Sequence, residues 1–173
     1  MAEFAAERTY RRFQKDLEFE TAFLRALKKT TDCGYARKLS LDEVNNCAEQ
    51  YFLIPFGVYK KSAVEKKLRI VFNSAAKYKG KCLNDCLLPG PPLQNLLPII
   101  ITRFREGAVA FTSDIEAMFN RIRMTETDCR YHRFVIKTTT SNTFEYYEMT
   151  RLSFGDKCSR FIHFIHFTTY GRR

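Results

Sequence analysis

Residues 51–72 read YFLIPFGVYKKSAVEKKLRIVF, and this stretch predicts a β-hairpin. Apolar and aromatic side chains fill residues 51–59, and an alternation of apolar and charged side chains marks residues 67–72, as in two strands. Pro55 confines the first strand to a sheet edge or a bend, because proline has no backbone N–H to donate. The lysine-rich residues 61–66 form the predicted turn.

Two helices are predicted before the hairpin. In residues 12–29 apolar side chains recur at steps near three and four with charges between them, which indicates an amphipathic helix. The Asp-Cys-Gly sequence at 32–34 ends it. Ser40 and Glu43 then match a capping box, in which the serine side chain accepts from the Glu43 amide and the glutamate reaches back. This box opens a shorter predicted helix toward Gln50.

The residues after the hairpin predict one more helix, then strands and a closing helix. Pro98 fits the first of these helices only if it lies in an early turn or kinks the helix. Asp114 would end a small apolar strand. The whole order of elements predicts an α+β fold rather than an alternating doubly wound one. The predicted elements of this part are helix 93–105, strand 108–114, antiparallel strands 133–138 and 144–152, and helix 157–167.

The composition is that of a globular protein with a basic surface. The 173 residues suffice for one domain or a large piece of a bigger protein. Hydrophobic residues make up 45% and charged ones 28%, which excludes a disordered tail and a coiled-coil rod. The net charge is +10, and most of the surplus lies in residues 60–81. This run is either a solvated face or a strip that contacts phosphates.

The cysteines and the apolar runs favour an intracellular protein, cytoplasmic or nuclear. The six cysteines lack Cys-x-x-Cys spacing, which argues against a disulfide framework and a zinc knuckle. Cys129 with His132, and His163 with His166, have a spacing that metal sites use, but core cysteines and half-exposed histidines explain them better. No apolar run reaches the length of a membrane span, and no secretory signal is visible.

Four sequence blocks resemble a known family. In chain order they are YFLIPFGVYK at 51–60, KLRIVFNSAA at 67–76, LNDCLLPGPPLQ at 83–94 and AFTSDIEAMF at 110–119. Together they closely resemble the reverse transcriptase of Pao/BEL-type LTR retrotransposons, over about residues 10–161. The resemblance implies a polymerase-like fold with an N-terminal helical segment at 1–50, a fingers-like region with the basic hairpin at 51–107, and a partial palm at 108–173.

The resemblance also assigns roles in a metal and nucleotide site. On its own, Asp114 at a strand end is explained as well by turn formation. By resemblance it is the catalytic, metal-binding carboxylate of the palm, and the Ile115 backbone carbonyl is a second ligand of Mg²⁺. Phe119 occupies the place of a bulky ring that excludes a ribose 2′-hydroxyl and so favours deoxynucleotides.

The other implied roles concern the incoming nucleotide. Arg69, and with it Lys60, lie where residues of the fingers grip the triphosphate, a task that suits a guanidinium fork. Phe154 and Gly155 lie in a segment, LSFGDKCS at 152–159, that packs under the templating base pair. The implied partners are a nucleic-acid template-primer and deoxynucleoside triphosphates, and no membrane.

Three departures from the family pattern limit the expected activity. The chain has no Tyr-x-Asp-Asp-like hairpin and no Asp-Asp dipeptide, so the two-metal site would be incomplete. Asn73 and Arg160 replace the Asp and Pro that are usual there. We therefore expect a fragment of an RNA-directed DNA polymerase, a nucleotidyltransferase cut before its second carboxylate pair, with Mg²⁺ or Mn²⁺ bound only if the palm is completed.

Two other classes of function compete with a polymerase fragment. The first is a non-enzymatic nucleic-acid-binding remnant of a retrotransposon, which would use the basic hairpin alone. The second is a metal-dependent hydrolase that uses Asp114 and Glu116, but it lacks a set of His or Asp residues at ligand spacing.

Overall fold

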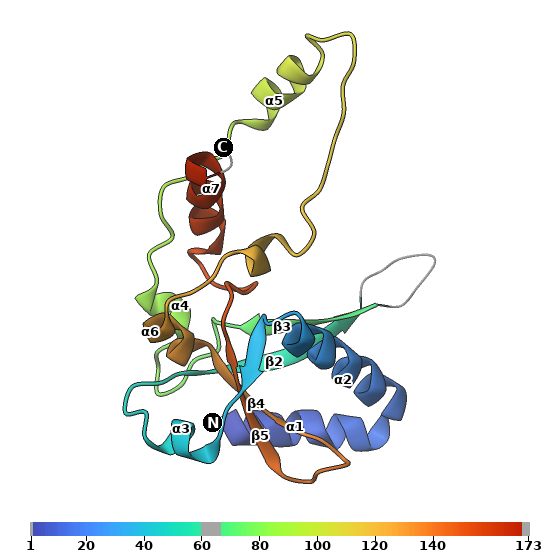
Figure 1. The fold of residues 1–173 in the computed structure, drawn as a ribbon, viewed down its shortest axis with the longest axis vertical. Coiled ribbons are helices and arrows are strands. Elements are labelled where there is room, and N and C mark those ends of the chain that lie inside the picture. The colour runs from blue at the N-terminus through green and yellow to red at the C-terminus, as the bar shows by residue number, and fades with distance from the viewer. Residues whose placement is uncertain (1, 60–66, 171–173) are drawn as a thin grey trace.

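The computed structural model describes residues 2–59 and 67–170. Its centre is a mixed five-stranded sheet in the order β1-β5-β4-β2-β3, and helices surround it, so the predicted α+β class is confirmed (Figure 1). The strands are β1 (Ala36–Lys38), β2 (Phe52–Tyr59), β3 (Leu68–Asn73), β4 (Arg133–Lys137) and β5 (Phe144–Met149). The helices are α1 (Ala2–Lys15), α2 (Leu17–Asp32), α3 (Leu41–Asn45), α4 (Leu83–Cys86), α5 (Leu97–Phe104), η1 (Met118–Arg121), α6 (Glu126–Cys129), η2 (Arg130–His132) and α7 (Ser159–Tyr170).

The predicted hairpin strands are confirmed as β2 and β3, which pair antiparallel in the register Pro55 to Phe72. On its other side β2 runs parallel to β4, but only two residue pairs join them, Phe52 with Arg133 and Leu53 with Phe134. Pro55 lies just beyond this short junction. Its missing N–H therefore breaks no bond to β4, which explains how proline fits a strand inside the sheet.

Helices α1 and α2 cover one face of the sheet with a core rich in phenylalanine. Phe13 and Phe23 meet edge to face with ring centroids 5.3 Å apart, and Phe72 and Phe134 lie 4.9 Å apart in the sheet below. The single helix predicted over 12–29 is in fact the end of α1 and most of α2. Asp16 separates them, because its carboxylate accepts from the Phe19 amide at 2.9 Å and caps α2.

The predicted capping box is confirmed at the start of α3. Ser40 accepts from the Glu43 amide, and the Glu43 carboxylate accepts from the Ser40 amide. The hydrogen bond from the Ser40 amide has the largest effect on the pKa of Glu43, and a hydrogen bond from the Arg37 side chain has the next largest. Together they lower that pKa to about 2. The helix ends at Asn45, earlier than predicted.

The opposite face of the sheet carries a charged ladder across three strands. Arg37 of β1, Glu148 of β5 and Arg133 of β4 are direct neighbours in the register. Glu148 accepts from Arg133 Nε at 2.9 Å and from Arg37 Nη2 at 2.9 Å. Because both carboxylate oxygens are used, the buried Glu148 is fully paired, as a buried charge must be.

A long excursion leaves the sheet after α4 and returns at η1. Figure 1 shows α5 far from the body of the molecule, above α7. Helix α5 begins at Leu97 rather than at residue 93 as predicted, so Pro98 is its second residue and lies in its first turn. We call residues 88–115 the apolar arm. Its exposed large apolar side chains are Leu88, Leu93, Leu96, Leu97, Ile99, Ile100, Ile101, Phe104, Val109, Phe111 and Ile115.

The prediction of a strand over residues 108–114 is wrong. These residues are exposed and irregular, and Val109 and Phe111 each keep 87% of their surface accessible. The reason is that a strand needs a neighbour, and no strand of residues 2–59 or 67–170 lies beside this segment. The later strands and the closing helix are confirmed as β4, β5 and α7. None of the helices in the described residues is long and apolar enough to cross a membrane.

Candidate functional site

The structure brings together three residues that the resemblance assigns to a nucleotide pocket. Phe119 of η1 packs edge to face on Phe154, with ring centroids 4.8 Å apart and an interplanar angle of 87°. Gly155 follows directly. Phe119 is 9% exposed and Phe154 is 43% exposed. The buried ring of Phe119 therefore supports the ring of Phe154, which faces solvent. His163 of α7 lies behind, with its ring 5.8 Å from Phe119.

The turn that holds Phe154 is clamped against the end of β3. Gly155 has φ +112°, a backbone conformation that residues with a side chain rarely adopt. A Cβ atom at this position would also overlap the Phe72 carbonyl oxygen. Asn84 of α4 holds the same turn from the side: its amide donates to the Gly155 carbonyl at 3.0 Å and accepts from the Lys157 amide at 2.8 Å. Glycine is therefore required by close approach as well as by φ.

A buried polar network lies directly under this turn. Asp156 is central: it accepts from Ser74 Oγ at 2.6 Å, from Ser153 Oγ at 3.3 Å and from His132 Nε2 at 3.1 Å. The side chains of His132 and Asp156 are 8% and 0% exposed. The network ties the end of β3, the start of β4 and the Phe154 turn into one unit. Because Asp156 lies between the serines and the histidine, this is not the order of a hydrolytic triad.

The setting of His132 favours the doubly protonated imidazolium form. Its Nδ1 faces the Asp128 carbonyl at 2.9 Å and its Nε2 faces Asp156, so each nitrogen meets an acceptor. Burial alone would lower the pKa of His132, but the hydrogen bond and the charge of Asp156 outweigh it and raise that pKa. The expectation of half-exposed histidines is wrong for His132, which is buried where it pairs with Asp156.

The raised pKa of His132 predicts a pH dependence of stability. A folded-state pKa above the unfolded value, about 6.5, contributes stability that is complete below that value and is lost as the pH rises through the folded pKa. We therefore expect the free energy of unfolding, from urea titrations between about pH 6 and 9, to fall with pH. The variant His132→Gln should remove most of this slope. An unchanged slope in that variant would contradict the assignment.

The predicted metal-binding residues lie apart from the contact between Phe119 and Phe154. Asp114 is exposed in the irregular part of the apolar arm, and its Oδ1 accepts from the Ile115 amide at 2.9 Å. Glu116 forms an exposed ion pair with Lys29 at 3.7 Å. In the described ranges no group of three or more His, Cys, Asp or Glu side chains could hold a metal ion. The residues present therefore do not fit a two-metal site, and we derive no step through Mg²⁺.

The predicted triphosphate ligands lie on the hairpin. Arg69 is exposed on β3, in register with Val58 of β2. It precedes Phe72 by three residues, so it is about 10 Å along the strand from the Gly155 turn. Lys60 lies outside the described residues.

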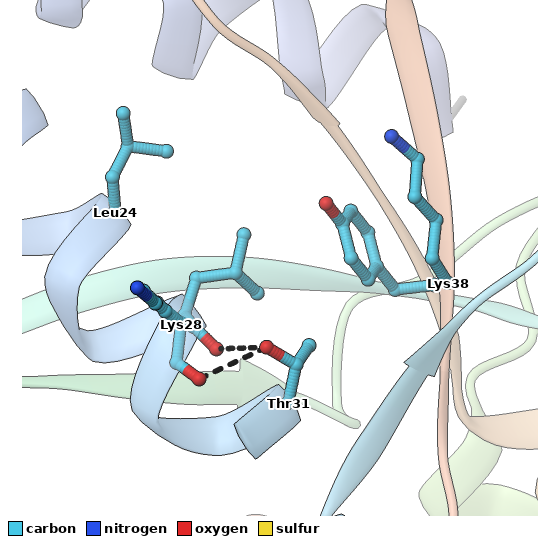
Figure 2. Close-up of a pocket in the computed structure, with 6 residues that line it drawn as sticks. Leu24, Lys28, Thr31 and Lys38 are labelled. Carbon is cyan, nitrogen blue, oxygen red and sulfur yellow. Dashed lines mark hydrogen bonds between the residues drawn. The ribbon is translucent and has the colours of Figure 1, made fainter.

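A separate pocket of about 300 Å³ lies between α2 and the β1–β5 edge of the sheet. Figure 2 shows Leu24, Lys28 and Thr31 on one side and Lys38 on the other. Thr31 Oγ1 donates to the Lys28 carbonyl at 2.9 Å, and Lys38 pairs with Glu145 at 2.8 Å. These polar groups already bond within the protein, and no predicted site residue lines the pocket.

Sequence reasoning missed His132, Asp156 and Ser74 as a unit. Each is a common surface residue type, and they are far apart in the chain, so only the fold brings them together. The one available signal was the block that contains Asp156, because it matched the family segment next to the nucleotide. The comparisons with known proteins add no relative: no family model matches the chain, and no curated protein matches it.

Proposed function

We propose that this chain is a portion of an RNA-directed DNA polymerase of the retrotransposon type, which binds template-primer and deoxynucleotides but does not complete the polymerase reaction. The observation that carries the proposal is the contact of Phe119 with Phe154 beside Gly155. The resemblance assigns these residues to one nucleotide pocket, although they come from separate parts of the sequence. Aromatic rings suit that task, because they stack on bases and pack against sugars.

The charge distribution supports a polyanionic partner. Lys67, Arg69, Lys77, Lys79 and Lys81 are exposed along and after β3. No acidic residue lies between Lys67 and Lys81. Such a run attracts phosphates, and the guanidinium of Arg69 can bind two phosphate oxygens at once.

Binding to a fluorescently labelled RNA–DNA template-primer tests the proposal. We expect fluorescence anisotropy to give an affinity that falls steeply with salt, because phosphate contacts release counterions. The double variant Arg69→Ala/Lys77→Ala should weaken binding about tenfold and reduce the slope of log K against log salt by about 2. Arg11→Ala/Arg25→Ala, a pair of exposed arginines on α1 and α2, is the matched control and should bind like the parent. Equal effects of both double variants on binding would contradict a nucleic-acid site at the basic residues along and after β3.

Polymerisation itself is expected to be absent, because no group of three or more His, Cys, Asp or Glu side chains within residues 2–59 and 67–170 could hold the metal ions at Asp114. A primer-extension assay with Mg²⁺ or Mn²⁺ should give no template-dependent product. Synthesis that Asp114→Asn abolishes would overturn this part of the proposal.

A non-enzymatic nucleic-acid-binding remnant is the second candidate. The exposed position of Asp114 in an irregular segment favours it, since a catalytic carboxylate is normally held rigidly. Calorimetric titration with a deoxynucleoside triphosphate separates the two candidates. A polymerase portion should bind it and lose that binding in Phe154→Ala, whereas a remnant should bind nucleic acid but not the triphosphate.

A further inference from the structure

Within the described residues, one segment of the apolar arm, residues 108–113, has backbone groups without partners, and the large apolar side chains of the arm are exposed. The backbone groups of residues 108–113 form no hydrogen bond with any part of residues 2–59 or 67–170. Val109 and Phe111 are the most exposed large apolar side chains of the arm. A helix as apolar as α5 is normally buried, yet all its large side chains remain accessible. Exposed patches of this size are typical of interaction sites.

We propose that residues 108–112 pair as an antiparallel strand with the same residues of a second copy of the chain, so that the apolar arm is a dimer interface. This inference does not rest on the proposed polymerase function. It accounts for the strand-like sequence of a segment that forms no strand alone, because the second copy supplies the missing neighbour.

The area of the arm is sufficient for a stable dimer. Its exposed large apolar side chains each offer roughly 100 Å², so the arm presents on the order of 1,000 Å². A stable interface buries about 800 Å² on each partner. A dimer that covers most of the arm therefore reaches the standard size.

The register of such a pair follows from symmetry and side-chain size. A two-fold axis perpendicular to the two-stranded sheet can lie at Ala110, which then faces Ala110 of the second copy. Val109 of each copy then lies opposite Phe111 of the other, and both pairs fall on one face. An axis at Val109 would instead place Phe111 opposite Gly107, and an axis at Phe111 would place Ala108 opposite Asp114. The axis at Ala110 is the one that pairs apolar with apolar.

Sedimentation tests the assembly. We expect the full chain to be in a monomer–dimer equilibrium with a dissociation constant in the micromolar range or below, because interfaces of this size span micromolar to picomolar affinities. Val109→Asp places a charge among the apolar pairs and should raise that constant at least about tenfold. Leu41→Asp replaces an equally apolar side chain outside the arm, 62% exposed, and should leave it unchanged. Circular dichroism should show parent-like folding of both variants, since both residues are exposed.

Cross-linking tests the register. In a background with the exposed Cys33 and Cys86 replaced by serine, Ala110→Cys should oxidise rapidly to a disulfide-linked dimer. Facing strand residues lie about 5 Å apart between Cα atoms, within the range of a disulfide. Ala108→Cys is the matched control: the two copies would be roughly 13 Å apart along the strands and should not link. A chain that stays monomeric, a dimer that Val109→Asp does not weaken, or faster linking at 108 would each overturn the proposal.

Discussion

Replacement of Gly155 by alanine is expected to destabilise the protein by about 3 kcal/mol or more. Two effects combine at this position. The backbone has φ +112°, which strains any residue with a Cβ, and the added methyl group would overlap the Phe72 carbonyl oxygen. Backbone cannot rotate away as a side chain can, so β3 or the Phe154 turn must move. Urea unfolding followed by circular dichroism measures the loss.

Gly80→Ala is the matched control for that experiment. Gly80 also has a positive φ, +83°, but no atom lies within 4 Å of a Cβ built there. Its substitution should therefore cost only the backbone strain, about 1 kcal/mol. If the two variants lose equal stability, the close contact with Phe72 does not matter. A Gly155→Ala variant that keeps its stability would show that the turn is not held against β3.

The second large effect is expected on removal of Asp156. Asp156→Ala leaves the buried imidazolium of His132 without its counter-charge and Ser74 without its acceptor. Breaking a buried pair from one side costs about 3–5 kcal/mol. Ser153→Ala, which removes the longest of the three bonds to Asp156, should cost only about 1 kcal/mol. Thermal unfolding at a pH below 6.5, where His132 of the parent protein is charged in both the folded and the unfolded state, gives the clearest difference.

A double variant distinguishes the pair from general packing damage. His132→Phe with Asp156→Leu replaces both partners by apolar side chains, which at buried pairs is often close to neutral. We expect the double variant to be more stable than Asp156→Ala alone. If it is less stable, the loss in the single variant reflects cavity formation rather than an unpaired charge.

The parts of the fold that local patterns determine were predictable from the sequence. Alternation along residues 67–72, the Ser40 and Glu43 box, and the strands β4 and β5 each follow from side-chain order over a few residues. The break at Asp16 was missed because the apolar period continues through it. The three-residue strand β1 was missed because so short a run has no detectable period.

Features that depend on distant pairing could not be predicted in the same way. The parallel junction of β2 with β4 joins residues some eighty positions apart, and no local pattern specifies it. The candidate site was predicted in part: resemblance named Phe119, Phe154 and Gly155, and the fold brings them together. The strand expected to present Asp114 failed for a physical reason. Its sequence favours a strand, but strand formation depends on a neighbour that local sequence does not reveal.

The pairing of strand β1 with the distant β5 also bears on how the chain folds. The β2–β3 hairpin closes over few residues and can form early. The first strand, β1, pairs with β5 through Ala36 and Met149, a loop of more than a hundred residues whose closure is slow. On the ribosome, β1 must therefore remain unpaired until almost the whole of this sequence has been synthesised.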